Sequence, residues 1–358
     1  MTNRVSLRIL ILNWRYAGHP RAGGAEYWTQ CVAEGLRSRG HHVTVFTSAV
    51  KGCAERENVN GVHVLRQGGQ FSVYFFARRF LRRSSRTFDV VLDEVNTRPF
   101  FAHRHFDGRS CAMFHQVAEE VWDYEAPRFL RTIGRRYFEP KWLRTFQGRR
   151  VLALSNSTAK SLARYGITNV SVIHPGVDQI ESITKRQVEI PTVCVLGRLV
   201  ESKRPLDALF AFAELKKRFP EAQCIVIGDG PLRAQIELLN LSSVNVTGFV
   251  PIPIRNELVA SSHVLLATSV REGWGMNVTE AAELGTLTIG YNVDGLSDSI
   301  AITNGILVDP EPKALAEALI RYFSDNHRPI PRKLNRPWSE VVADLEAYFL
   351  EMCRNQTC

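Results

Sequence analysis

Features that would identify a membrane-spanning or secreted protein are missing from this sequence of 358 residues. No apolar run approaches the roughly 20 residues that are needed to cross a bilayer, so the sequence predicts no transmembrane helix. The apolar run near the N-terminus turns to charged residues too early for a signal peptide and has no small-residue cleavage site after it. We therefore interpret this run as a buried first strand.

Cysteine is scarce and scattered. The seven cysteines are odd in number and are never spaced as Cys-x-x-Cys, so neither a disulfide framework nor a zinc site is indicated. A reducing cytoplasm is the expected compartment. No Gly-x-Gly-x-x-Gly follows the first strand of either half of the chain, which argues against a dehydrogenase.

Acidic residues are few in the first part of the chain. Residues 1–150 hold 25 Lys and Arg against 13 Asp and Glu, whereas the rest holds 20 against 23. The basic residues alternate with aromatic ones at 74–88 and 128–150. Such a surface suits an anionic lipid layer or an anionic substrate, and a solvated arginine-rich face is the alternative. Nucleic acid is disfavoured because no known nucleic-acid-binding motif accompanies the charge.

Buried strands alternate with amphipathic helices twice along the chain. The expected strands include residues 8–13, 88–96 and 110–115 in the first half, and 192–199, 222–230, 244–250, 263–269 and 287–292 in the second. This alternation predicts an α/β protein with two doubly wound, Rossmann-like domains. We expect domains at 1–175 and 191–337, a linker at 176–190, and a C-terminal helix at 338–358 for which packing on the N-terminal domain is one arrangement.

Several loops follow predicted strands, where ligands bind in open α/β folds, and we expect the two domains to face a central cleft. Gly23 and Gly24 precede a helix, whose N-terminal N–H groups suit a phosphate; a simple turn is the alternative. Arg198 and Lys203 follow a buried strand and are placed to hold both phosphates of a diphosphate, unless they are merely solvated.

The stretch SVREGWGMNVTEAAELGT, residues 269–286, carries two glutamates. Glu272 lies in the glycine-rich turn between a strand and a helix, where it can accept hydrogen bonds from sugar hydroxyls. Glu280 lies about one turn into the helix, where its carboxylate can bind a vicinal pair of ribose hydroxyls. We interpret the pair as holding the two sugars of a nucleotide-sugar rather than as an acid/base pair.

Taken in order, these motifs resemble a known family. GGAE near the start, HPGVD at the domain junction, GRLVESKR and the two spaced glutamates are similar to those of the retaining glycosyltransferases of family four, which have the GT-B fold. The resemblance covers nearly the whole chain. It implies transfer of a hexose-type sugar from a nucleotide-sugar to a hydroxyl acceptor with retention of configuration, without a metal or another cofactor. No Asp-x-Asp motif occurs at a fitting site, in agreement with metal independence.

The resemblance also assigns roles to residues. Arg198 and Lys203 would neutralise the departing diphosphate, Glu272 would bind the donor sugar, and Glu280 the donor ribose. The loop after Glu272 would supply N–H contacts, and His115 matches a histidine that lines the donor sugar. The loop residues are Gly273, Trp274, Gly275, Met276 and Asn277. Trp274 stands where phenylalanine is more usual, and His174 where asparagine is common; neither suggests loss of activity.

The partners are less defined by the sequence. We expect the nucleotide base to be recognised by backbone near Gly248 and Phe249, with UDP-sugars as the first choice and GDP-mannose next. The basic first half favours a lipid-linked or cell-envelope acceptor and peripheral attachment to the inner face of an anionic membrane; a soluble natural-product acceptor is the alternative.

Two other classes of protein stay open. One is a nucleotide-sugar epimerase, for which Asp93, Glu94, Glu119 and Asp123 are candidate acid/base groups. The other is a non-catalytic sugar-nucleotide-binding membrane partner.

Overall fold

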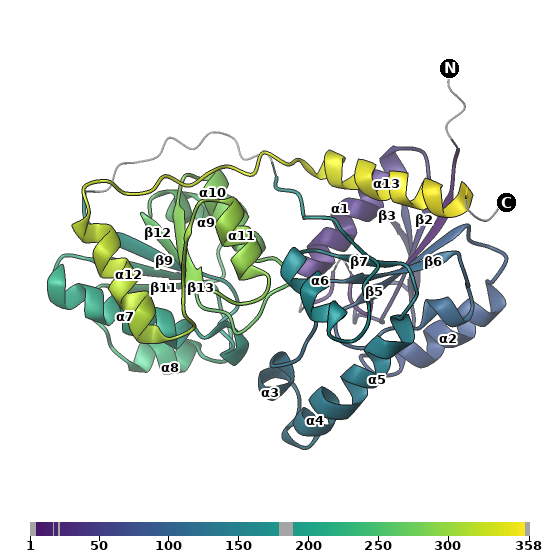
Figure 1. Cartoon of the computed structure of the whole chain (residues 1–358), viewed down its shortest axis with the longest axis horizontal. Helices are drawn as coiled ribbons and strands as arrows, with labels where there is room; N and C mark the ends of the chain where they lie inside the picture. The colour runs from purple at the N-terminus through teal and green to yellow at the C-terminus, as the bar shows by residue number, and fades with distance from the viewer. Residues whose placement is uncertain (1–4, 17, 21, 179–188, 355–358) are drawn as a thin grey trace. The chain divides into compact units, whose positions relative to one another are not determined.

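The computed structural model describes residues 5–16, 18–20, 22–178 and 189–354. Within these ranges the chain divides into two compact units (Figure 1). Unit 1 lies within Met1–Val117, Arg136–Gly176 and Arg336–Cys358, and unit 2 within Ala118–Arg135 and Val177–Asn335. Each unit has its own sheet, parallel or nearly so, and its own hydrophobic core. The predicted α/β class with two parallel-sheet domains is confirmed.

Unit 1 is built on an eight-stranded sheet in the order β3-β4-β2-β1-β5-β6-β7-β8. Neighbouring strands are parallel except for β3, which is antiparallel to β4. The central strand β1 is buried along nearly its whole length, as expected where helices cover both faces of a sheet. The strands are β1 (Arg8–Leu12), β2 (His42–Thr47), β3 (Arg56–Val59), β4 (Val62–Arg66), β5 (Val90–Val95), β6 (Ser110–Phe114), β7 (Val151–Ala153) and β8 (Val170–Val172).

Two helices from opposite ends of the chain pack together on unit 1 (Figure 1). Helix α1 (Gly24–Ser38) buries an apolar stripe that includes Trp28, and α13 (Trp338–Arg354) packs along it. The helices approach so closely at Gly35 that a Cβ there would lie 2.4 Å from Cγ2 of Val342. The C-terminal helix is therefore part of the core of unit 1.

Helix α2 (Val73–Arg83) covers the opposite face of the sheet. Its buried residues Val73, Ala77 and Leu81 share a core with Phe46. Shorter helical segments complete the first half of the chain. They are η1 (Ala102–Arg104), α3 (Val121–Glu125), α4 (Arg128–Ile133), the π-helical turn η2 (Gly134–Phe138), α5 (Glu139–Leu143), η3 (Arg144–Phe146) and α6 (Asn156–Ala163).

Unit 2 has a six-stranded parallel sheet in the order β11-β10-β9-β12-β13-β14. Helices α7 and α12 pack together against one face, and α9 and α10 bury apolar side chains against the other. The strands are β9 (Thr192–Leu196), β10 (Gln223–Ile227), β11 (Val244–Gly248), β12 (Val264–Ala267), β13 (Leu287–Tyr291) and β14 (Ile306–Val308). The helices are η4 (Glu201–Lys203), α7 (Pro205–Arg218), α8 (Arg233–Leu238), α9 (Ile252–Ala260), α10 (Met276–Glu283), α11 (Leu296–Ile302) and α12 (Pro312–Ser324).

The segment 118–135 differs from the domain boundaries expected from the sequence, which placed it in the N-terminal domain. In the structure it is part of unit 2, and its acidic side chains bind other residues of that unit. Glu119 and Glu120 pair with Arg271, and Glu125 accepts a hydrogen bond of 2.8 Å from Ser202 Oγ. Most of the expected linker at 176–190 lies outside the described residues, which end at 178 and resume at 189.

Candidate active site

The loops after β9 and β12 carry the charged residues that the sequence predicts at the donor site of unit 2. These two strands are neighbours, so their carboxyl ends place both loops at the same edge of the sheet. Two hydrogen bonds of 2.9 Å tie the loops together: Val270 N donates to Ser202 O, and Thr268 Oγ1 donates to Lys203 O. The backbone thereby brings Lys203 close to Glu272.

Lys203 and Glu272 form an ion pair in the structure, between Nζ and Oε1. Ser269 Oγ donates a hydrogen bond of 2.7 Å to the same carboxylate oxygen. The sequence assigned these two residues to different parts of one ligand, the diphosphate and the sugar. Their direct contact is consistent with both groups serving one site, and a phosphate that bound Lys203 would have to compete with Glu272 for it.

Arg198 is the more accessible of the two predicted phosphate-binding residues, with 47% of its side chain exposed. Its guanidinium nitrogen Nη2 lies 3.9 Å from Oε1 of Glu125, at the limit of an ion pair. Such a long, exposed pair stabilises the fold little. The guanidinium of Arg198 is therefore available to bind an anion at modest cost.

The glycine-rich loop after Glu272 has the conformation that its glycines predict. Gly275 has φ of 86° and immediately precedes α10, where a Cβ would lie 2.8 Å from Cδ2 of Leu296. Asn277 Nδ2 donates to Leu196 O at 3.0 Å and fixes the start of α10 beside the end of β9. The ring of Trp274 is buried, so this loop residue can contact a ligand only through its backbone. Gly273 precedes Trp274 in this loop, and Met276 is the first residue of α10.

Glu280 lies on α10 and pairs with Arg255 of α9, with 3.1 Å between Nη1 and Oε2. Burial raises the pKa of Glu280, although the positive charge of Arg255 opposes this shift. The sequence identified Glu280 but not Arg255, because the two are 25 residues apart in separate helices. Arg255 orients the carboxylate and keeps part of its acceptor capacity occupied.

Gly248 and Phe249 lie at the carboxyl end of β11, the edge strand of the sheet in unit 2. Gly248 has φ of 70°, and its carbonyl accepts a hydrogen bond of 3.0 Å from Gly228 N. The side chain of Phe249 is 90% exposed. An aromatic ring left this open can stack on a planar group, in addition to the backbone contacts expected from the sequence.

In unit 1, Gly23 and Gly24 begin helix α1 as predicted, with Gly23 at the N-cap position. The side chain of Glu26 returns to this end of the helix and accepts a hydrogen bond of 2.7 Å from Gly23 N. The other oxygen of Glu26 accepts from Arg15 Nε at 2.7 Å. The buried carboxylate thus satisfies the N–H of Gly23 and holds Arg15 beside the glycine turn.

His115 follows β6, at the same edge of its sheet as the ends of β1 and β5. The imidazole is buried, and its Nε2 lies 3.0 Å from Oε2 of Glu94. The indole of Trp28 packs edge-on against it, with ring centroids 5.4 Å apart at 85°. The predicted histidine is therefore held by a buried carboxylate and a buried ring.

The four carboxylates considered for an epimerase are divided between the two units. Asp93 is buried and accepts hydrogen bonds of 3.0 Å from the backbone N of Phe100 and of Ala102. Burial raises the pKa of Asp93 to about 6, against the effect of these donors. Glu94 binds His115 in unit 1, whereas Glu119 and Asp123 lie in unit 2.

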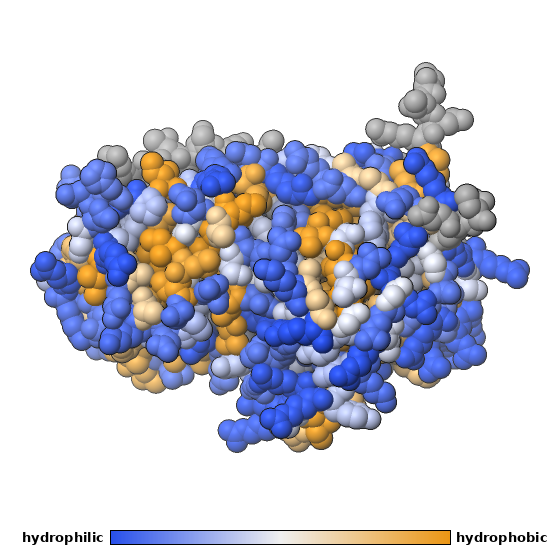
Figure 2. Space-filling view, viewed as in Figure 1, coloured by the Kyte–Doolittle hydropathy of each residue, from blue (hydrophilic) through white to orange (hydrophobic). Residues whose placement is uncertain are grey.

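The basic segments of the first half form exposed surfaces with apolar side chains among the charges. On α2, four arginines and Phe75 are exposed, and around α4 blue side chains border a small orange group in Figure 2. Exposed apolar residues of that region are Phe129, Ile133 and Tyr137. No helix of the described residues has both the length and the apolar character to cross a membrane.

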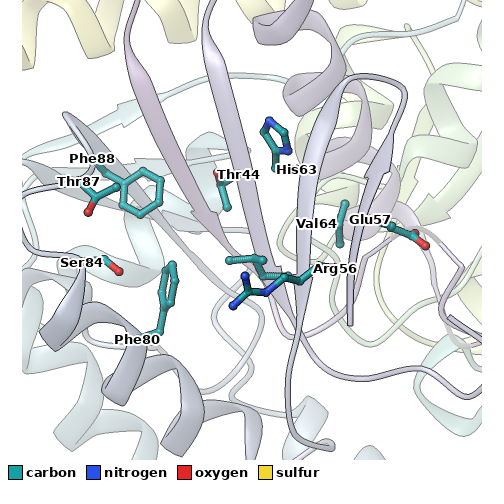
Figure 3. Close-up of a pocket in the computed structure, with 10 residues that line it drawn as sticks. Thr44, Arg56, Glu57, His63, Val64, Phe80, Ser84, Thr87 and Phe88 are labelled. Atoms are coloured by element: carbon teal, nitrogen blue, oxygen red, sulfur yellow. The ribbon is translucent and has the colours of Figure 1, made fainter. Parts of the chain in front are cut away.

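A separate pocket of about 370 Å³ lies in unit 1 between β2, β3, β4 and the end of α2 (Figure 3). Arg56 lies on one side of it, and Phe80 and Phe88 on the other. The residues at 84–88 precede β5, so this pocket is at the amino end of that strand, opposite His115. None of the site residues predicted from the sequence lines it, and we do not assign it to the candidate active site.

Comparisons with known proteins relate this arrangement to characterised enzymes. The chain is 31% identical to 2-deoxystreptamine glucosyltransferase of Streptomyces kanamyceticus over 46% of this chain and 45% of that protein. It is 26% identical to a GDP-mannose-dependent phosphatidylinositol dimannoside mannosyltransferase of Mycobacterium tuberculosis over 58% of this chain and 59% of that one. The matched regions thus span only about half the length of these curated relatives.

The fold is shared by solved structures. A sucrose-phosphate synthase from Thermosynechococcus elongatus superposes with a TM-score of 0.73 over 98% of both chains, at 20% sequence identity. This likeness confirms the GT-B fold class. Two family models match adjoining halves of the sequence: Glycosyltransferase Family 4 over residues 22–179, and Glycosyl transferases group 1 over residues 177–340. The chain therefore belongs to the GT-B glycosyltransferases of the family-four, group 1 kind.

Proposed function

We propose that this glycosyltransferase moves a hexose-type sugar from a nucleotide-sugar to a hydroxyl acceptor with retention of anomeric configuration. The observation that carries the proposal is the ion pair of Lys203 with Glu272 between the loops that follow β9 and β12, with the exposed Arg198 in the same loop as Lys203. Two cations and a carboxylate on adjoining loops match the demands of a ligand that is anionic at one end and rich in hydroxyls at the other.

The chemistry follows from these charges. The bond between the anomeric carbon and the diphosphate oxygen breaks, and Arg198 and Lys203 stabilise the negative charge that develops on the leaving group. The acceptor oxygen bonds to the anomeric carbon from the same face, and its proton passes to a phosphate oxygen. Glu272 holds the donor sugar and Glu280 the ribose. This route requires neither a protein nucleophile nor a metal ion.

Fewer observations bear on the identity of the nucleotide-sugar donor. UDP-sugars are our first choice and GDP-mannose the second. The name of one relative specifies a glucosyltransferase, and that of another specifies dependence on GDP-mannose. The exposed ring of Phe249 is placed to stack on a base of either kind, so it does not discriminate between them.

We further propose that the acceptor is lipid-linked and that the basic surfaces formed by residues 74–88 and 128–150 hold the enzyme peripherally at the inner face of an anionic membrane. Each exposed arginine contributes about 1 kcal/mol of attraction near such a surface. Exposed rings such as Phe75 add apolar contacts at the headgroup boundary. The relatives include enzymes named for a phosphatidylinositol acceptor and for 2-deoxystreptamine, so a soluble acceptor is the competing case.

The transfer reaction is tested with Arg198→Ala and Lys203→Ala against a panel of UDP-, GDP-, ADP- and dTDP-sugars. Each variant should lose transfer at least tenfold, since a charge-assisted hydrogen bond contributes about 1.5–3 kcal/mol. Lys217→Ala, on the exposed face of α7, is the matched control and should keep full activity. NMR of the product should show the anomeric configuration of the donor. An inverted product would overturn retention, and binding of a nucleotide-sugar without any transfer would favour a non-catalytic partner.

Membrane attachment is tested separately by co-sedimentation with vesicles. The protein should bind anionic but not neutral vesicles, and high salt should release it. Substitution of the four arginines of α2 by alanine should weaken binding. A control variant should replace four exposed cations of unit 2. The first set is Arg78, Arg79, Arg82 and Arg83, and the control set is Lys217, Arg218, Lys313 and Arg321. Equal binding of both variants would refute the assignment of this surface.

A further inference from the structure

Glu94 is buried in unit 1, with its side chain fully enclosed, and all its observed hydrogen bonds converge on one oxygen. Oε2 lies 2.8 Å from Asn13 Nδ2, 2.6 Å from Thr29 Oγ1 and 3.0 Å from His115 Nε2. These partners come from the end of β1, from α1 and from the end of β6. Burying a carboxylate costs free energy unless hydrogen bonds compensate the lost hydration, and here three donors serve one oxygen. The arrangement therefore determines which atoms around Glu94 carry protons.

The orientation of Asn13 determines which atom donates. Its Oδ1 accepts hydrogen bonds from Asn96 Nδ2 at 3.0 Å and from the backbone N of Arg15 at 3.3 Å. Only an oxygen can accept both, so the amide nitrogen of Asn13 must be the atom facing Glu94. Oε2 of Glu94 is therefore an acceptor, and the imidazole can complete the network only by donating a proton from Nε2.

The network around Glu94 does not include the other ring nitrogen of His115, Nδ1. Nδ1 of His115 is buried and has no hydrogen-bond partner among the residues that the structure describes. The indole of Trp28, set at 85° to the imidazole, restricts rotation of the ring. In the neutral imidazole, a proton fixed on Nε2 makes Nδ1 a hydrogen-bond acceptor.

We propose that Glu94 is a positioning residue that fixes His115 in its Nε2–H tautomer, so that Nδ1 accepts a hydrogen bond from a hydroxyl of the sugar substrate. This assignment rests on the proposed transfer reaction for its substrate and on the hydrogen-bond network for its geometry. A sugar hydroxyl is the appropriate partner because it can donate to Nδ1 where a phosphate oxygen cannot. Asn13 and Thr29 hold the carboxylate, and Glu94 holds the ring.

The tautomer is tested first, by ¹⁵N NMR of the histidine-labelled full-length protein, with the His115 signals assigned from a His115→Asn variant. The wild type should show a protonated Nε2 and an unprotonated Nδ1. In Glu94→Leu, the carboxylate that accepts from Nε2–H is gone, so the proton should become shared between Nε2 and Nδ1. A wild-type spectrum with the proton on Nδ1 would overturn the proposal whatever the reaction is.

Kinetics then test the role toward substrate. Glu94→Leu should lower kcat by about tenfold, the size expected for one lost hydrogen bond, and should leave the affinity for the free nucleotide diphosphate unchanged. Glu34→Leu is the matched control, since Glu34 accepts hydrogen bonds from Gln30 and Asn60 outside this network; the tautomer of His115 and kcat should stay close to wild type. If Glu94→Leu changes the tautomer without a change in kcat, the positioning role is wrong.

The two layers of the proposal fail in different ways. If the wild type transfers no sugar from any donor, the proposed function fails and the role of Nδ1 toward sugar fails with it, while the spectrum alone still decides whether Glu94 sets the tautomer. If transfer is retained and Glu94→Leu does not fold, the wild-type spectrum still decides whether His115 holds its proton on Nε2.

Discussion

Arg271 offers the sharpest test of how unit 2 is held together. Its side chain is only 9% exposed, and Nη2 lies 2.6 Å from Oε2 of Glu119 and 2.9 Å from Oε2 of Glu120. It also pairs with Asp294, which precedes α11. One guanidinium thus joins the segment 118–135 to the loop that carries Glu272. Arg271→Ala would leave three carboxylates without this partner.

The magnitude follows from burial. Removing one member of a buried ion pair costs roughly 3–5 kcal/mol. Glu120 and Asp294 are 38% and 27% exposed, so water can partly solvate them once Arg271 is gone. We therefore expect the low end, a decrease of about 3 kcal/mol in the free energy of unfolding of unit 2. Arg135→Ala is the control. Arg135 pairs with Glu120 and Asp123 but is 40% exposed, so its loss should cost less than about 1 kcal/mol.

Urea unfolding and hydrogen exchange measured by mass spectrometry check this prediction. A two-unit chain need not unfold in one step, so exchange at residues 118–125 and 269–275 is the more specific measurement. Both peptides should lose protection in Arg271→Ala and keep it in Arg135→Ala. If the two variants unfold at the same urea concentration with equal exchange, the ion-pair network does not hold the segment.

Three further predictions concern stability and pH. Gly35→Ala should destabilise unit 1 by about 1–3 kcal/mol through overpacking against Val342, whereas Gly69→Ala, whose Cβ would meet only Ser72 Oγ at 4.0 Å, should be close to neutral in the same thermal unfolding assay. Because the pKa of Asp93 is raised to about 6 in the folded state, this group should lower the free energy of unfolding as pH rises from about 4 to 6. Accordingly, the stability of Asp93→Asn relative to wild type should improve over this range in urea titrations, and an unchanged difference would contradict the assigned pKa. Finally, burial raises the pKa of Glu280, so Glu280→Gln should weaken nucleotide-sugar binding most at neutral pH and least in acid, as measured by calorimetry.

The fold was accessible from the sequence because it depends on local patterns. The apolar run of β1 and the spaced apolar residues of α1 are short-range signals with the periods of a buried strand and a half-buried helix. The hairpin of β3 and β4 was equally readable but was not predicted. Asn60 and Gly61 form its two-residue turn, with φ of 51° and 85°, and Asn-Gly is the characteristic sequence of such a turn.

The assignment of residues 118–135 to unit 2 could not be predicted from local sequence patterns. The composition of this segment does not indicate which of the two domains it joins. Its assignment depends on Arg271, about 150 positions away, and on the loop that contains Ser202. The acidic run at 119–125 followed by arginines was visible, but a charge run gives no information about which distant partner it binds.

The side-chain partners of the candidate site were unpredictable for a related reason. The sequence identified Lys203, Glu272 and Glu280 as separate ligand-binding groups, and the structure pairs each of them with an opposite charge on another element. Partly buried charges need such partners, and several partners would serve, so the choice is made by the tertiary fold. A diphosphate that binds Lys203 must compete with Glu272, and a ribose that binds Glu280 must share it with Arg255. In the proposed reaction, the affinity for the donor therefore depends on the free energy of its contacts with Lys203 and Glu280 minus that of the ion pairs which it disrupts. The identities of the charged residues alone cannot determine this difference.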